Sequence, residues 1–252
     1  NYGNALLGEM DEVALWNRAL TASEINYLKH RRLGGTEDGL LGYWRFDESG
    51  GTAANNTAIN AFHGTLLNNP AWVTSHAAVA LEPIAASAIK LDGVDDFVTV
   101  AHQPDLNSYP FTASTWFRTT NGGGVVQGLV TKSVDTGNAW SLLVQSGKLR
   151  GFYYRSFGNF AIDAVSAASV ADGAWHHAAL TVDASGGKLF LDGVIVGSSA
   201  WTGAAGAITV EPHELRIEKN RSTSHDHRLA RRTRLHHNVA GDPDRLSSRA
   251  GT

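Results

Sequence analysis

Short segments in which apolar and polar residues alternate, separated by glycine-containing turns, limit most strongly what this chain can fold into. Alternation along segment 111–118 puts Phe111, Ala113, Thr115 and Phe117 on one face and Ser114 and Trp116 on the other. Segments 140–145 and 148–154 flank Ser146-Gly147, and segments 175–183 and 188–196 flank Ala184-Ser-Gly-Gly187. Successive side chains of a strand point to opposite faces, so each segment can bury one face. The pattern predicts an all-β fold: a two-sheet antiparallel jelly-roll sandwich.

Composition excludes several other classes of protein. The 252 residues include no cysteine, which rules out disulfides, thiol catalysis and cysteine metal sites. No run approaches the roughly 18 apolar residues of a membrane-spanning helix, so no membrane insertion is expected. The 27 glycines serve turns, and none lies in the strand–loop–helix context of a phosphate-binding loop.

One segment, 21–30, has helical character. Thr21 is placed to cap it, and Glu24 stands three residues later, which is the pattern of a capping box. We therefore expect one short helix near the N-terminal side of the fold.

Charge changes abruptly near the C-terminal end. Residues 218–252 hold eight Arg or Lys against four Asp or Glu, and no aromatic residue follows Trp201. One interpretation is a basic arm for an anionic polymer. The other is a disordered or non-native tail, because strand alternation stops at the same point. We expect the second, and no nucleic-acid partner.

Six blocks stand in a characteristic order: 42–52, 55–66, Leu91-Asp-Gly-Val-Asp-Asp-Phe-Val-Thr-Val100, Thr112-Ala-Ser-Thr-Trp-Phe117, Gly173-Ala-Trp-His-His-Ala178 and Lys188-Leu-Phe-Leu-Asp-Gly-Val194. They resemble the laminin G-like domains of bacterial extracellular proteins, which belong to the concanavalin A-like lectin/glucanase superfamily. The resemblance implies the same sandwich and an extracellular or cell-surface location.

The segment Gly8-Glu-Met-Asp-Glu-Val-Ala-Leu-Trp-Asn-Arg-Ala-Leu20 resembles the closing strand of that family, yet it precedes the opening block. We therefore expect residues 1–33 to be the closing strand and helix of a preceding repeat, 34–39 a linker, 40–217 the jelly roll and 218–252 the tail. The early strand is expected to fill the vacant closing position beside Tyr43–Phe46. This order predicts a piece of a multi-domain chain.

Carboxylates in the early strand raise the question of catalysis. Glu9, Asp11 and Glu12 resemble the start of the catalytic strand of laminarinase-type glycosidases, which need two carboxylates flanking the scissile bond. Alternation predicts Glu9, Asp11 and Val13 on one face, so the acid/base position holds Val13 or Ala14 instead of a carboxylate. We therefore expect no enzyme.

Clustered aspartates suggest a metal site. Ca²⁺ takes six to eight oxygen ligands in flexible geometry, and relatives in the superfamily bind it at sandwich edges. The expected ligand set is Asp92, Asp95, Asp96, Asp47, Asn56 and Asn60. The alternative is that these aspartates only accept hydrogen bonds from turn amides.

Aromatic residues suggest a ligand surface. Sugars stack their C–H faces on exposed rings, although most rings of a sandwich pack in its core. The expected exposed set, which interleaves rings with polar groups, is Tyr154, Arg155, Phe157, Asn159 and Phe160. The sequence thus predicts a non-catalytic module that binds carbohydrate or an extracellular protein, with Ca²⁺ as its one candidate cofactor. A purely structural spacer repeat is the alternative, and a glycoside hydrolase is third.

Overall fold

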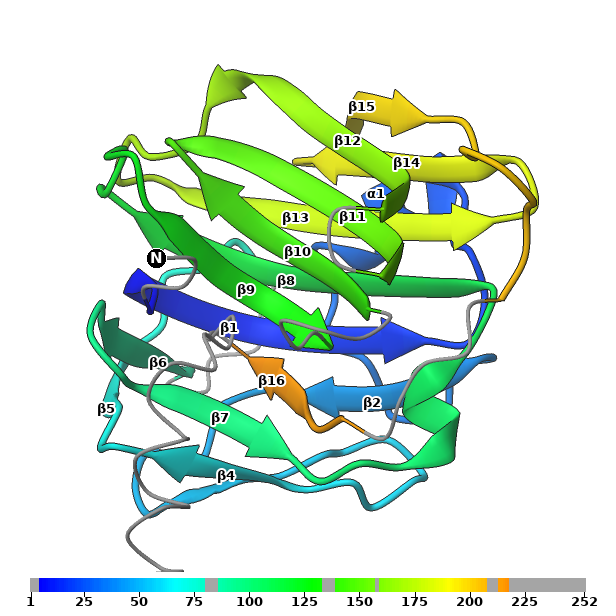
Figure 1. Ribbon diagram of the computed structural model, residues 1–252. Coiled ribbons are helices and arrows are strands. Elements are labelled where there is room, and N and C mark those ends of the chain that lie inside the picture. The colour runs from blue at the N-terminus through cyan, green and yellow to red at the C-terminus, as the bar shows by residue number, and fades with distance from the viewer. Residues whose placement is uncertain (1–4, 80–85, 133–138, 157–158, 208–212, 218–252) are drawn as a thin grey trace, which may run out of the picture. The chain divides into compact units, whose positions relative to one another are not determined.

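The computed structural model describes residues 5–79, 86–132, 139–156, 159–207 and 213–217 (Figure 1). The expectation for residues 218–252 therefore lies outside the described residues. The described part forms two antiparallel β-sheets, which confirms the predicted fold class. No helix among the described residues has the length and apolar character needed to cross a membrane.

One sheet, here called the β1 sheet, has the strand order β15-β14-β13-β8-β1-β6-β5, and β2 also pairs with β1. Its strands are β1 (Leu7–Trp16), β2 (Leu40–Trp44), β5 (Ala71–Thr74), β6 (Ser87–Asp92), β8 (Phe111–Thr119), β13 (Trp175–Asp183), β14 (Gly186–Leu191) and β15 (Val194–Ser199).

The other sheet, here called the β11 sheet, has the order β12-β11-β10-β9-β16-β7-β4-β3. Its strands are β3 (Ala53–Ala54), β4 (Gly64–Leu67), β7 (Phe97–Val100), β9 (Val126–Lys132), β10 (Ala139–Gln145), β11 (Lys148–Ser156), β12 (Asn159–Ser169) and β16 (Leu215–Ile217). In Figure 1, β9 to β12 lie in front of β8 and β13.

The main core fills the space between the sheets. It includes Phe111 and Phe117 from β8 and Trp140 and Tyr153 from the β11 sheet. Phe111 packs against Trp140 with ring centroids 4.9 Å apart. Burying each large apolar side chain stabilises the fold by about 1.5–3 kcal/mol, so this core can hold the sandwich without disulfides.

A smaller core lies on the outer side of the β1 sheet. There the helix α1 (Ala22–Leu28) places Ile25 against Trp16, Tyr43 and Phe190. The helix begins as predicted: Thr21 accepts a hydrogen bond from the backbone of Glu24, and the Glu24 carboxylate accepts one from the backbone of Thr21. The capping box is confirmed. A short 3₁₀ helix (Pro104–Asn107) buries Leu106.

Strand β1 lies inside its sheet, not at an edge. It pairs with β8 along most of its length, with β6 through its first half and with β2 through its second half. Met10, Val13 and Leu15 enter the main core, and all three are almost completely buried. The strand is therefore part of the sandwich that the later segments build.

A β-bulge in β1 overturns one expectation. The register with β8 shifts between Asp11 and Ala14, and Glu12 has a φ of 52°. The extra residue breaks strict alternation. Val13 therefore joins Met10 in the main core, whereas we expected it on the face of Glu9 and Asp11.

Candidate functional site

The outer face of the β11 sheet carries an aromatic cluster. Phe152 and Tyr154 from β11 and Phe160 from β12 pack on one another, with ring centroids 5.3 to 5.9 Å apart, and Leu143 and Val126 lie beside them. Tyr153 points the other way, into the main core. No described helix or strand forms a third layer here, and a sheet face of that kind is ordinarily polar. An apolar cluster in this place is the unusual feature of the fold.

Arg150 covers the edge of this cluster. Its guanidinium lies 5.4 Å from the ring centre of Phe152 and 5.1 Å from that of Phe160. Nε and Nη2 donate to the two carboxylate oxygens of Asp163, each at 2.7 Å, and Nη1 donates to Gln145 at 2.6 Å. Asp163 stands diagonally across from Arg150, because Phe152 pairs with Asp163 and Arg150 with Val165. The sheet therefore fixes a planar cation over aromatic rings.

The structure corrects part of the predicted ligand set. Tyr154 is only 5 % exposed, so the expectation of an exposed ring is wrong: the side chain is packed in the cluster. Phe160 is half-buried at the cluster edge, and Asn159 is exposed. Phe157 and the side chain of Arg155 lie outside the described residues. Sequence reasoning missed Arg150 and Asp163, which alternation along β11 and β12 places on the same face as the rings.

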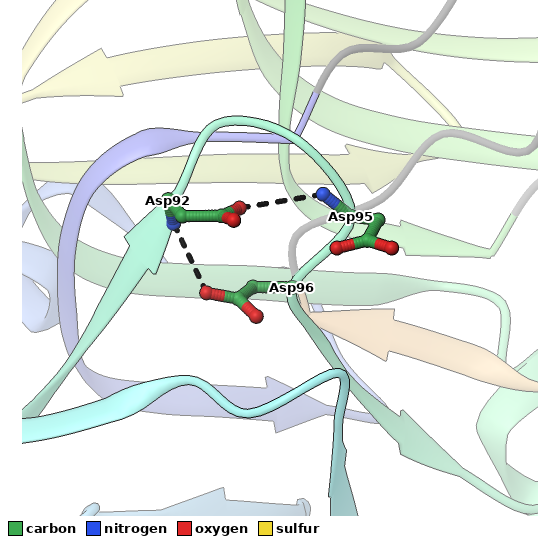
Figure 2. Close-up of side chains that lie close together, drawn as sticks. All are labelled: Asp92, Asp95 and Asp96. Atoms are coloured by element: carbon green, nitrogen blue, oxygen red, sulfur yellow. Dashed lines mark hydrogen bonds between the residues drawn. The ribbon is translucent and has the colours of Figure 1, made fainter.

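Three aspartates gather at the turn between β6 and β7 (Figure 2). Oxygens of Asp92, Asp95 and Asp96 all lie within 4.8 Å of one another. The Asp92 carboxylate accepts hydrogen bonds from the amides of Val94 (2.8 Å) and Asp95 (3.3 Å), and Asp96 accepts one from the amide of Asp92 (3.1 Å). Burial, together with the neighbouring Asp92 carboxylate, raises the pKa of Asp96. Three hard oxygen donors in one place fit Ca²⁺, which would need backbone carbonyls or water besides.

The other three expected metal ligands lie elsewhere. Asp47 forms ion pairs with Arg32 (3.1 Å) and Arg45 (2.6 Å) and accepts from the amide of Ser87, at the end of β6 opposite to Asp92. The Asn56 amide group bonds the backbone around Tyr43 and Asn60. The expectation of one six-residue site is therefore wrong for Asp47 and Asn56, whose side chains bind other groups of the protein.

The carboxylates of β1 are enclosed. Asp11 accepts from Ser75, and Glu12 accepts from the hydroxyl of Tyr43. Burial raises the pKa of Asp11 to about 7, and burial together with the Asp11 charge raises the pKa of Glu12 to about 9. Glu9 is bound by Arg118 at 2.7 Å. The bulge thus brings two acids together beneath other side chains, and not on the two sides of an open cleft.

A small cavity lies between α1 and the outer face of the β1 sheet. Its volume is about 30 Å³, which is room for about two water molecules and well below a typical ligand pocket. Glu12, Trp116 and His177 are among its lining residues. His177 is 6 % exposed, and burial lowers the pKa of its imidazole to about 3. The buried ring is therefore neutral, and this cavity is a packing feature of the helix-covered face.

Comparison with known proteins assigns the fold to a family. No curated protein sequence matches the chain significantly. The family model of the Concanavalin A-like lectin/glucanases superfamily, of the laminin G type, matches residues 92–226, from the aspartate turn through β16. This match spans more than half of the chain and agrees with the two antiparallel sheets. The chain therefore belongs to the concanavalin A-like lectin/glucanases superfamily.

Proposed function

We propose that this chain is a non-catalytic binding module whose recognition surface is the outer face of β9 to β12. The observation that carries the proposal is the aromatic cluster with Arg150 bound across its edge. Phe160, the partly exposed ring of the cluster, supplies apolar contact, and the polar side chains beside it supply hydrogen-bonding groups. Apolar contact and a few placed polar groups are the components of a specific recognition site.

Carbohydrate is the ligand class that this surface suits best. The C–H faces of a sugar ring pack on half-buried aromatic edges such as Phe160, and hydroxyls pair with Asn159, Gln145 and Asp163. Asp163 is 34 % exposed, so its carboxylate remains open to a ligand on one side. The laminin G-like family, whose domains are typically extracellular, supports an extracellular or cell-surface location. A protein partner would use the same surface.

Enclosure of the β1 carboxylates supports the non-catalytic reading. Glycoside hydrolysis needs two carboxylates that reach a bound sugar from both sides. Asp11 and Glu12 are 2 % and 7 % exposed, so a sugar does not reach them. We therefore expect no release of reducing ends from β-glucans, and reproducible release that Glu12→Gln abolishes would contradict this proposal.

A glycan array tests the binding role. We expect the full chain to bind a subset of oligosaccharides, and we expect Phe160→Ala and Arg150→Ala to weaken that binding about tenfold or more, because they remove the ring and the cation of one site. Tyr27→Ala is the matched control, since it removes an exposed ring from α1. A uniform absence of binding would refute the carbohydrate role, and equal binding by all variants would place the site elsewhere.

Ca²⁺ binding at the aspartate turn is part of the proposal. Asp92, Asp95 and Asp96 would supply three carboxylates, and the ion would relieve the repulsion among them. Calorimetry should show Ca²⁺ binding that Asp95→Ala weakens about tenfold or more, because one charged ligand is lost. Asp38→Ala is the control, since that side chain is 97 % exposed on another loop. No heat in the unmodified chain, or unchanged heat in Asp95→Ala, would refute the site.

A further inference from the structure

Each nitrogen of the Arg150 guanidinium already donates one hydrogen bond, so three of its five N–H groups are engaged. Asp163 takes Nε and Nη2 in a two-point pair, and Gln145 takes Nη1. A two-point pair between guanidinium and carboxylate is both strong and directional. A ligand therefore meets Arg150 as a planar group over Phe152 and Phe160 whose charge is balanced by Asp163, and not as a free cation.

Asp163 also determines the electrostatic potential above the Arg150 guanidinium. Its side chain is 34 % exposed, whereas that of Arg150 is 20 % exposed, so the negative partner is the more accessible one. An anionic group that approached Arg150 would have to displace Asp163 or lie beside it. Both options are unfavourable, because one breaks the two-point pair and the other places like charges together.

The other charged side chains that the structure describes near Arg150 do not reverse this balance. Further along the same face, Arg216 is paired with Glu214. Lys148 is exposed on β11 two residues before Arg150, and a single solvated ammonium holds an anion weakly. The described part of this face therefore offers one isolated cation, whereas acidic polymers are held by several.

From this geometry we infer that Asp163 is the specificity-determining residue of the surface: by occupying Arg150, it makes the face select uncharged saccharides and reject acidic ones. The inference rests on the proposed carbohydrate-binding function and extends it to the charge of the ligand. Removing the Asp163 charge would free the guanidinium for a carboxylate of the ligand, at the same place and over the same rings.

The test compares matched ligands by calorimetry on the full chain. Neutral hexasaccharides of glucose, mannose and galactose are each paired with the counterpart whose C6 hydroxymethyl groups are oxidised to carboxylates. We expect the unmodified chain to bind at least one neutral member about tenfold or more tightly than its oxidised counterpart. Asp163→Asn should abolish or reverse that ratio, since a freed guanidinium gains a charge-assisted pair.

Two variants serve as controls. Asp163→Glu keeps the charge and should keep the preference for the neutral ligand. Asp38→Asn changes the net charge equally from an exposed site on another loop, so it separates a local effect from general attraction by the basic residues 218–252. Melting curves establish that each variant is folded.

The outcomes are distinct. A preference that is lost in Asp163→Asn and kept in both controls supports the inference. Oxidised ligands that bind the unmodified chain as well as neutral ones overturn it while leaving the binding function intact, and so does a preference that Asp163→Asn leaves unchanged. Failure of every ligand to bind overturns the carbohydrate-binding function, and the inference with it.

Discussion

Deletion of residues 1–33 is expected to abolish cooperative unfolding of this domain. The deletion removes β1, which pairs with three other strands and places Met10, Val13 and Leu15 in the main core. It also uncovers the outer face of the β1 sheet, where Ile25 of α1 packs. A net stability of about 5–15 kcal/mol does not survive the loss of a central strand. Differential scanning calorimetry and circular dichroism measure the effect.

Point variants test whether the loss of stability comes from the packing of β1 in the core or only from the shorter chain. Val13→Asp puts a charge in the core and should unfold the domain or lower its melting temperature strongly, whereas Leu7→Ser, in the same strand but 44 % exposed, should change it little. We propose that β1 serves as the closing strand of the jelly roll, placed before the opening strand in the chain. An unchanged melting temperature after the deletion would contradict this role.

A fall in stability as the pH rises is the second large effect. Asp11 and Glu12 have folded-state pKa values raised to about 7 and about 9, so the folded state holds their protons more tightly than the unfolded state does. Their contribution to the free energy of unfolding is complete below about pH 4, near the ordinary carboxyl pKa, and it is lost as the pH rises through 7 and then 9. Each such proton changes the free energy of unfolding by about 1.4 kcal/mol per pH unit within its window.

Glu12→Gln isolates this effect. Between pH 7 and 9 the variant should lose the part of the slope that comes from Glu12, about 2–3 kcal/mol in total, because glutamine accepts from Tyr43 without titrating. Asp38→Asn, an exposed site, should retain the slope of the unmodified chain. The free energy of unfolding is measured by urea unfolding at each pH. Equal slopes against pH in all three proteins would show that Asp11 and Glu12 do not cause the loss of stability at alkaline pH.

His177 should limit stability on the acidic side. Burial lowers its folded-state pKa to about 3, so its contribution is present above about pH 6.5 and is lost as the pH falls toward 3. The sign is opposite to that of the two acids. His177→Phe, which keeps a ring against Trp116, should flatten the acidic part of the urea-unfolding curve. A steeper acid loss in that variant would contradict the assignment.

Much of the fold could be predicted because its determinants are local. Alternation along 111–118 fixes which side chains of β8 enter the core, and Ser146-Gly147 fixes the hairpin of β10 and β11, which the structure confirms. The capping box at Thr21 is equally local. The bulge at Glu12 could not be read in this way, because it depends on how β1 fits between β8, β6 and β2.

The candidate site shows where local reasoning stops. Tyr153 and Tyr154 are adjacent and similar, and only the pairing with β10 and β12 decides which of them faces the core. Arg150 and Asp163 meet because of the register of two strands, which no spacing in the sequence reveals. The aspartate turn can be predicted from the sequence, because its members lie within five residues. The position of Asp47 cannot, because it forms ion pairs with two arginines that only the fold brings to it.

Hydrogen–deuterium exchange of the full chain, with and without a saturating oligosaccharide chosen from the glycan array, tests the location of the recognition surface most directly. We predict slower exchange in peptides that cover 148–156 and 159–165, on β11 and β12, and unchanged exchange in peptides that cover α1. Protection concentrated at α1 and the outer face of the β1 sheet would contradict the account, and so would binding that protects neither face.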